Sequence, residues 1–263
     1  MAIVINGSGT LSGLAVGGLP DGTVDSGTLA ANSVDSAELI DGAVDATHLA
    51  SGVGVGGLQS QQVFTATGTW TRPSNITLIK VTVVGGGGSG GGGGDAASGH
   101  DSGSGGGGGG TSIEIIDVTS LASETITIGA GGTGVGDGTD GNAGGTSSFG
   151  SYCTATGGAG GLKGSNSGNL YGGAGGTGAS GDLNFMGGAG DSGIKDASSG
   201  HGIVRKGAIG GNSFYGGISK GIAGGTDRNG RTYGGGSGGG VSGVYGTSGN
   251  GAAGVVVIEE YIK

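Results

Sequence analysis

Gly157-Gly158-Ala159-Gly160-Gly161 is followed in the chain by Gly172-Gly173-Ala174-Gly175-Gly176 and then by Gly187-Gly188-Ala189-Gly190. Pairs of glycines continue to residue 253 between short inserts with larger side chains, and two earlier tracts, Gly85 to Gly94 and Gly103 to Gly110, share this character. Ordering the 78 glycines costs on the order of 100 kcal/mol of conformational entropy. A folded glycine field therefore needs an unusual source of stability.

The inserts favour an ordered field, because they keep Leu, Ile, Val and Phe where a solvated linker would carry Ser, Glu or Lys. Chains without side chains can pack as extended helices with three residues per turn, and their backbone groups must then bond between neighbours. Collagen would need Gly at every third position and abundant Pro, whereas this chain has two prolines and irregular glycine spacing. We expect polyglycine II packing, with a disordered glycine-rich field as the alternative.

Composition limits both the core and the partners. The 263 residues are 33% hydrophobic and 4% aromatic, with a net charge of −9, so burial of side chains alone cannot stabilise the whole chain. There is no basic stripe for nucleic acid, and Cys153 is the single cysteine. Neither a signal-peptide pattern nor a run of 18 apolar residues is seen. We expect no nucleic-acid binding and no membrane insertion.

Residues 1–20 are expected to dock on a larger particle. Ile3-Val4-Ile5 predicts a short strand, and Asn6-Gly7 is typical of a hairpin turn. The segment has too little side-chain bulk to fold alone. Its apolar residues are the candidate docking contacts, namely Ile3, Val4, Ile5, Leu11 and Leu14.

Residues 21–58 contain a ten-residue unit that occurs three times, at 21–30, 31–40 and 41–50, before a Gly/Ser/Gln hinge at 51–60. Apolar residues every five positions fit neither a helix nor a sustained strand, and such repeats bury their apolar groups by stacking or by meeting identical chains. We expect an extended trimeric shaft, with an acidic, partly disordered linker as the alternative. Its predicted trimer core is Val24, Leu29, Val34, Leu39, Val44 and Leu49.

Residues 59–263 form the predicted head. Strand-like sequence occurs at 62–73, 76–84, 113–118, 124–128, 149–156 and 254–263. Phe64, Ala66 and Trp70 share one face of the first segment, whereas the apolar parity of 76–84 slips, which indicates a bulge or a strand buried on both faces. The fold class is therefore mainly β, a small β framework from which a polyglycine II sandwich extends.

Several framework motifs occur in a fixed order: Gly68-Thr69-Trp70, Pro73, Ile79 to Gly88, Gly145 to Gly150, Ala155 to Gly158 and Gly254 to Glu259. Together they resemble the glycine-rich domain of bacteriophage tail fibre proteins over about residues 62–262. The repeats at 21–50 resemble those of marine phage fibre proteins. The glycine field is more distantly similar to the receptor-binding tips of T-even phage long tail fibres, where inserts between polyglycine II helices contact the host.

The resemblance implies a virion fibre with a tip that binds a receptor on the bacterial host. We expect that receptor to be a glycan or an outer-membrane protein. The repeats predict a homotrimer, and residues 1–20 are expected to hold it to other tail proteins. The alternative is a structural virion protein, such as a head fibre, decoration or spacer, without receptor binding. Tyr and Arg offer large contact areas with polar ends. The candidate receptor contacts are the aromatic and basic residues of the inserts, namely Tyr171, Phe185, His201, Arg205, Tyr215, Arg228, Arg231, Tyr233 and Tyr245.

Enzymatic and cofactor chemistry is not expected. The tract at 85–94 follows a strand, but no helix pattern follows it to hold a phosphate. The histidines are scattered, and Asp137 to Asn142 lacks the distal Glu of a calcium loop, since Ser148 stands at that position. Glycan cleavage would need paired carboxylates in a groove, and acids are sparse in the glycine field. We therefore expect no catalytic residue, cofactor or metal.

Overall fold

The computed structural model describes residues 4–5, 11–12, 57–94, 101–165, 170–194, 207–219, 228–241 and 246–262. The chain divides into two compact units, Met1–Val55 and Gly56–Lys263. In the first unit, β1 (Val4–Ile5) pairs antiparallel with β2 (Leu11–Ser12), as expected of a hairpin. The predicted docking residues Ile3 and Leu14, and all six residues of the predicted trimer core, lie outside the described residues.

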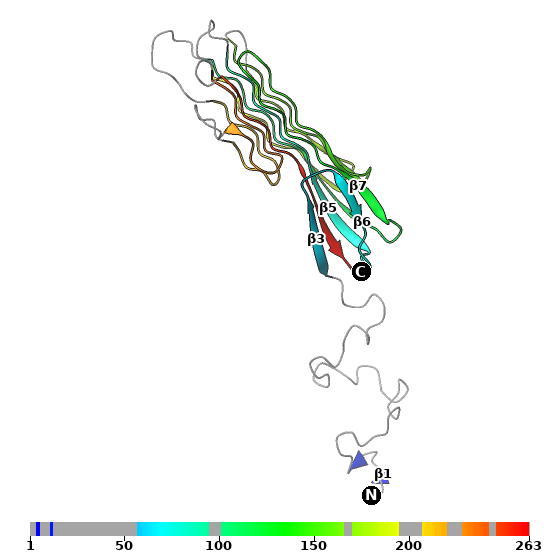
Figure 1. Ribbon diagram of the computed structural model, residues 1–263. Helices are drawn as coiled ribbons and strands as arrows, with labels where there is room; N and C mark the ends of the chain where they lie inside the picture. Colours follow the sequence, from blue (N-terminus) through cyan, green and yellow to red (C-terminus); the bar gives the residue numbers. More distant parts are fainter. Residues whose placement is uncertain are drawn as a thin grey trace. The chain divides into compact units, whose positions relative to one another are not determined.

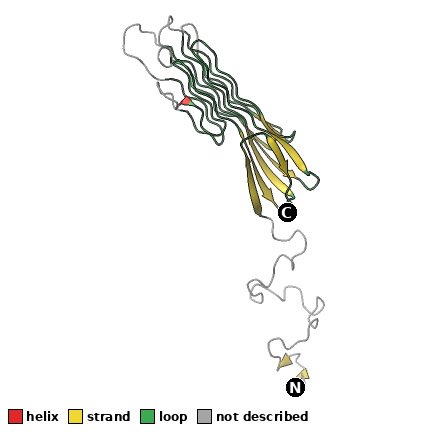
Figure 2. Ribbon diagram, in the orientation of Figure 1, coloured by secondary structure: helices red, strands yellow, loops and turns green. Residues whose placement is uncertain are grey.

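The second unit contains two antiparallel sheets of five strands each (Figure 1, Figure 2). The first sheet has the order β10 (Gly178–Ala179), β9 (Cys153–Ala155), β8 (Ser147–Phe149), β7 (Ser123–Thr127), β4 (Gly68–Thr71). The second sheet has the order β11 (Leu183–Phe185), β6 (Thr111–Asp117), β5 (Leu78–Val84), β12 (Val255–Tyr261), β3 (Leu58–Phe64). The described residues contain almost no helix, and no helix among them has the length and apolar character to cross a bilayer.

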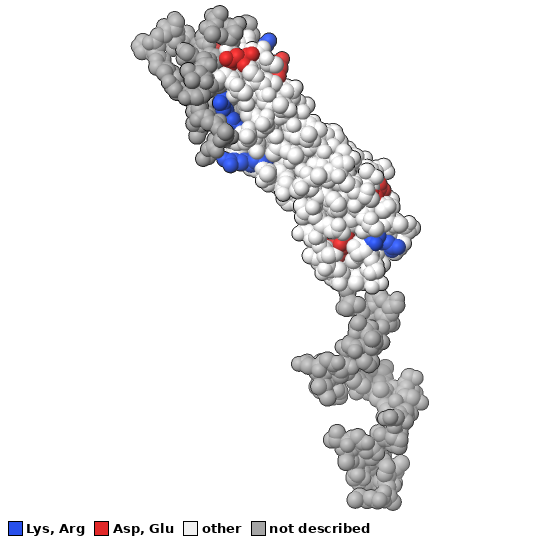
Figure 3. Space-filling model, viewed as in Figure 1, with Lys and Arg blue, Asp and Glu red and all other residues white. Residues whose placement is uncertain are grey.

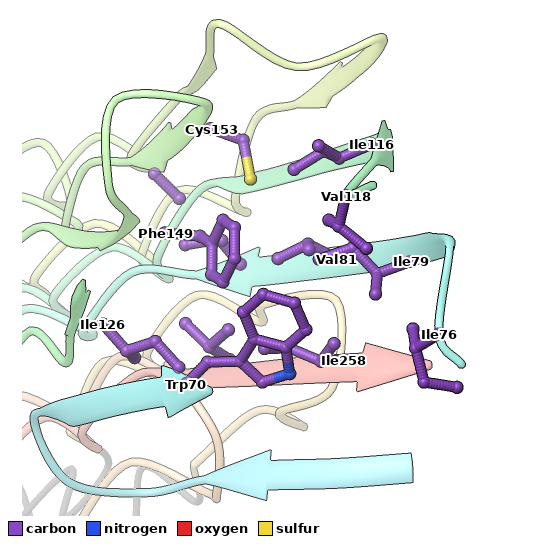
Figure 4. Packing of buried hydrophobic residues seen from close by; sticks show 13 residues of the cluster. Trp70, Ile76, Ile79, Val81, Ile116, Val118, Ile126, Phe149, Cys153 and Ile258 are labelled. Carbon is purple, nitrogen blue, oxygen red and sulfur yellow. The ribbon is translucent and has the colours of Figure 1, made fainter. Parts of the chain in front are cut away.

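The hydrophobic core lies between the two sheets (Figure 4). The first sheet contributes Trp70, whose ring meets Phe149 edge-on at a centroid distance of 5.8 Å. Strands β5 and β12 of the second sheet contribute alternate residues, because successive side chains of a strand point to opposite faces. These are Ile79, Val81 and Val83 from β5, and Val256 and Ile258 from β12.

A buried carboxylate links strands of both sheets. Glu260 in β12 is fully buried and accepts hydrogen bonds from Trp70 Nε1 at 2.7 Å and from Gln62 Nε2 at 2.8 Å. The hydroxyl of Ser60 donates a third. A buried carboxyl group is stable only when hydrogen-bond partners such as these surround it. This network therefore holds β3 and β4 against the C-terminal strand.

The structure corrects three strand predictions. The segment 62–73 is not one strand, since it bends at 65–67 and its halves, β3 and β4, join different sheets, which leaves Ala66 exposed. The predicted strand at 149–156 is the β8–β9 hairpin. The segment 76–84 was predicted to contain a bulge or to be buried on both faces. Its strand, β5, pairs in regular register with both neighbours and has no bulge, and it is buried on both faces toward its end, which confirms the second possibility.

The glycine tracts continue from the strands as extended segments that lie side by side (Figure 1). We call these segments rods. In the rod 85–94, backbone N–H groups three residues apart donate to the same neighbour. Residues 85, 88, 91 and 94 donate to rod 101–110, residues 86, 89 and 92 to rod 139–145, and residues 87 and 93 to rod 246–252, at N···O distances of 2.8–3.0 Å.

The carbonyls of the same rod accept bonds from three further segments. Gly158, Gly161 and Gly164 donate to the carbonyls of residues 86, 89 and 92, respectively. Ser237 and Gly240 donate to the carbonyls of residues 88 and 91. Gly132 and Gly138 donate to the carbonyls of residues 87 and 93. Rod 85–94 thus bonds to six surrounding segments and is buried throughout. Rod 101–110 is also buried throughout and repeats the pattern, donating in turn to 188–194, 234–240 and 156–162.

The outer rods show the same period in their exposure. Along 156–164, residues 158, 161 and 164 are buried, and along 170–177, residues 170, 173 and 176 are buried. Of these six residues, five are glycines. Side chains instead occupy exposed positions, as with Thr156, Ala159 and Leu162. The Gly-Gly-Ala-Gly-Gly motif therefore places its alanine outward and its glycines against other backbones.

At some positions a buried serine hydroxyl, rather than a backbone carbonyl, accepts the hydrogen bond of a backbone N–H. Ser237 Oγ accepts from Gly90 N at 2.8 Å and donates to the carbonyl of Gly249. Ser104 Oγ accepts from Leu162 N at 2.6 Å, and Ser248 Oγ from Val135 N at 2.9 Å. Each hydroxyl completes the pairing of main-chain groups that would otherwise be costly to bury.

Candidate functional site

Three aromatic side chains form a ridge beside the outer face of the second sheet. Phe185 at the end of β11 stacks on Phe214 with ring centroids 6.0 Å apart, and Phe214 meets Tyr215 edge-on at 4.9 Å. Their side chains remain 44%, 53% and 45% exposed. We call these residues the aromatic ridge. Rings that support one another lose little freedom when a ligand covers them, which favours binding.

Hydrogen bonds from Ser213 hold the ridge against a second turn. Ser213 N donates to the carbonyl of Gly216 at 3.0 Å, and Gly216 N donates to Ser213 Oγ at 2.8 Å, which closes the turn carrying Phe214 and Tyr215. The Ser213 hydroxyl also donates to the carbonyl of Tyr233. The two turns that carry Tyr215 and Tyr233 are therefore fixed relative to one another.

A groove lies on each side of this arrangement. The larger, which we call the tyrosine groove, has a volume of about 530 Å³ and is lined by Gln61, Val63, Tyr215, Thr232, Tyr233, Val255 and Val257. The smaller has a volume of about 190 Å³ and is lined by Thr111, Phe185, Met186, Asn212, Ser213 and Phe214. The larger volume falls within the range of small-ligand sites.

The floor of the tyrosine groove comes from the outward side of the second sheet. Val63 of β3 lies opposite Val257 of β12, and Val257 lies opposite Thr82 of β5. Val255 shares the outward side of β12 with Val257, because the residue between them points into the core. The result is an apolar floor with polar side chains of Gln61 and Thr232 at its margins.

The tyrosine groove has no charged lining residue. The nearby ammonium of Lys80 forms an ion pair with Glu259 at 2.7 Å, and Glu259 lies opposite Gln61. The hydrogen bond with Glu259 raises the pKa of Lys80 above its ordinary value, outweighing the lowering by desolvation, with smaller contributions from Tyr261 and Tyr215. In the view of Figure 3, acidic and basic residues gather toward the ends of the second unit, and its middle is largely uncharged.

The predicted receptor contacts fall into separate groups. Phe185, Tyr215 and Tyr233 lie together around the ridge and the tyrosine groove. Tyr171 is 65% exposed on another rod, and Arg231 is exposed, but neither lines a groove. His201, Arg205 and Tyr245 lie outside the described residues.

Arg228 does not fit the predicted role of a displayed contact. Its side chain is only 8% exposed, and Nη1 donates to the carbonyl of Thr247. Desolvation by burial lowers the pKa of Arg228. We therefore assign its guanidinium to the packing of the glycine bundle.

Sequence reasoning missed several residues of this surface. Phe214 is not among the predicted receptor contacts, and it is the centre of the ridge. No sequence motif marked the other residues that line the tyrosine groove as functional, namely Gln61, Thr232 and the three valines. Gln61 and the valines meet because β3 and β12 are neighbours in the sheet, although these strands lie at opposite ends of the second unit's sequence, and Thr232 joins them from a turn.

Residues 62–261, more than half of the chain, match the family model of a glycine-rich domain. No curated protein matches the chain. Within the described residues, no group of three or more His, Cys, Asp or Glu side chains is arranged to hold a metal ion.

Proposed function

The chain belongs to the family of glycine-rich domains, and from that premise we propose that it is a bacteriophage tail fibre protein that attaches to the bacterial host surface. The observation that carries this proposal is the aromatic ridge, half-exposed and held by hydrogen bonds on a framework of paired backbones. Exposed aromatic rings on rigid supports are typical of recognition surfaces.

We infer that the rods are polyglycine II helices. The support is their hydrogen bonding, in which partners change with a period of three residues and bonds run between rods, as expected of a helix with three residues per turn. Six bonded segments surround rod 85–94. Such packing makes the head stiff without a large side-chain core, which suits a protein that presents a few bulky groups at a distance from the particle.

The rest of the proposal follows the sequence of the first unit. Residues 1–20 dock on other tail proteins, and residues 21–58 form a shaft that joins three copies through the repeated valines and leucines. The head is an adhesin and has no catalytic role.

Adsorption tests the proposal. The labelled full chain is expected to bind cells of the phage's host saturably and to slow adsorption of the phage. Antibodies against the chain should label the tail fibres in electron micrographs. Labelling of the virion without any cell binding or competition would contradict the adhesin and leave a structural virion protein. Absence of the chain from the particle would contradict the virion assignment itself.

A further inference from the structure

We propose that the tyrosine groove binds a neutral oligosaccharide of the bacterial surface, with Tyr215 as the stacking platform and Gln61 as a hydrogen-bonding contact. This proposal rests on the proposed adhesin function and names its receptor class and binding residues. It places recognition beside the β framework, in a groove formed by residues from both ends of the second unit and by two glycine-field turns.

The charge of the groove indicates a neutral ligand. Its seven lining residues are uncharged, and the ammonium of Lys80 is held by Glu259 at 2.7 Å. A phosphorylated or carboxylated polymer would need positive or well-aligned donor groups to offset its desolvation. The lining residues offer no such cation.

The polarity of the groove matches the two sides of a sugar ring. A pyranose presents C–H groups on its faces and hydroxyls at its rim. The rings of Tyr215 and Tyr233 and the floor of Val63, Val255 and Val257 suit the C–H faces. The amide of Gln61, the hydroxyl of Thr232 and the two phenols both donate and accept hydrogen bonds, as sugar hydroxyls do.

The size of the groove favours a short glycan segment over a protein surface. Its volume of about 530 Å³ is that of a small-ligand site. A protein receptor would need a complementary interface of roughly 1,000 Å² or more. Because the Ser213 hydroxyl bonds the carbonyl of Tyr233, the two tyrosine-bearing turns are already placed before binding. Little conformational entropy is then lost when the sugar enters.

The test uses the full chain and intact host cells. The cells are treated either with periodate, which cleaves the vicinal diols of sugars, or with a protease, and binding of labelled protein is then measured. We expect periodate to abolish binding and protease to leave it unchanged. Loss of binding after protease, but not after periodate, would overturn the glycan assignment while leaving the adhesin function intact. No binding to untreated cells would instead contradict the proposed function.

Substitutions locate the site. We expect Tyr215→Ala to weaken binding about tenfold or more and Gln61→Ala about fivefold, the loss of one hydrogen bond. The matched control is Tyr171→Ala, because Tyr171 is exposed and lines neither groove. Unfolding temperatures equal to that of the unaltered protein would show that each variant is folded. Unchanged binding by folded Tyr215→Ala and Gln61→Ala, or equal loss in Tyr171→Ala, would overturn the proposed site.

Discussion

Replacing Gly107 by alanine tests whether backbone pairing stabilises the head. Gly107 lies in the buried rod 101–110, where a Cβ would come 2.0 Å from the carbonyl oxygen of Ala174 and 2.5 Å from its carbon. Ordinary contact begins at 3.4 Å, so rod 170–177 would have to move outward by about 1.4 Å. The obstacle is backbone, which cannot rotate away as a flexible side chain can.

The cost follows from the bonds that this movement breaks. Gly173 N and Gly176 N donate to the carbonyls of Gly105 and Gly108, both at 2.8 Å. A displacement of about 1.4 Å would take these distances beyond hydrogen-bonding range. At about 1–3 kcal/mol for each buried hydrogen bond lost, the two bonds cost about 2–6 kcal/mol, and the smaller entropy of unfolded alanine recovers about 0.4–1 kcal/mol. We expect Gly107→Ala to lower the free energy of unfolding by about 2–5 kcal/mol.

Denaturant and thermal unfolding of the full chain measure this loss, which corresponds to a fall in melting temperature on the order of 5–15 °C. The matched control is Gly136→Ala, because a Cβ at Gly136 meets nothing within 4 Å. That variant should be neutral or slightly more stable, by about 0.4–1 kcal/mol. Equal stability of the two variants would refute the close backbone packing.

Three further predictions concern buried polar groups. Ser237→Ala should cost about 1–3 kcal/mol in denaturant unfolding, because it leaves the N–H of Gly90 without its acceptor; an unchanged unfolding midpoint would contradict the bridging role. Trp70→Phe should cost about 2–3 kcal/mol, since Glu260 stays buried and loses one donor. An unfolding free energy equal to that of the unaltered protein would count against the network. Burial raises the pKa of Cys153 to about 12, so a thiol reagent should modify it at neutral pH only after unfolding. The unfolded thiol ionises near its ordinary pKa of 9.0, whereas the folded thiol stays protonated up to a pH of about 12. Cys153 should therefore lower the free energy of unfolding as the pH rises from 9.0 toward about 12. Unfolding of Cys153→Ser over this pH range checks the prediction, because the variant should lack this decrease.

Much of the β framework is readable from the sequence, because β-branched residues concentrate in β5, β6 and β12. The break between β3 and β4 is not, since Phe64 and Trp70 keep the same parity across the bend. Strand β11 was also missed: its residues were read as a surface insert, and pairing with β6, far away in sequence, makes it a strand.

The three-residue period of the rods is present in the sequence, but the glycines alone do not show it. The pattern is not Gly at every third position, because central rods have glycine at most positions and, in an outer rod such as 171–177, two glycines alternate with one other residue. The residues that interrupt the glycines do keep the period, as at 171, 174 and 177. The candidate site was harder to predict, because Gln61, Val63 and Val257 line one groove only when neighbouring strands and two turns come together.

The outward positions of the outer rods have a consequence for variation. Tyr171, Ala174 and Thr177 differ greatly in size, yet all are exposed on one rod whose intervening buried positions, 173 and 176, are glycines. Because the glycines at 173 and 176 donate the hydrogen bonds to rod 101–110, we expect substitutions at an outward position such as Ala174 to leave these bonds intact. We therefore expect the outward positions of the outer rods to tolerate side chains of different size with little loss of stability.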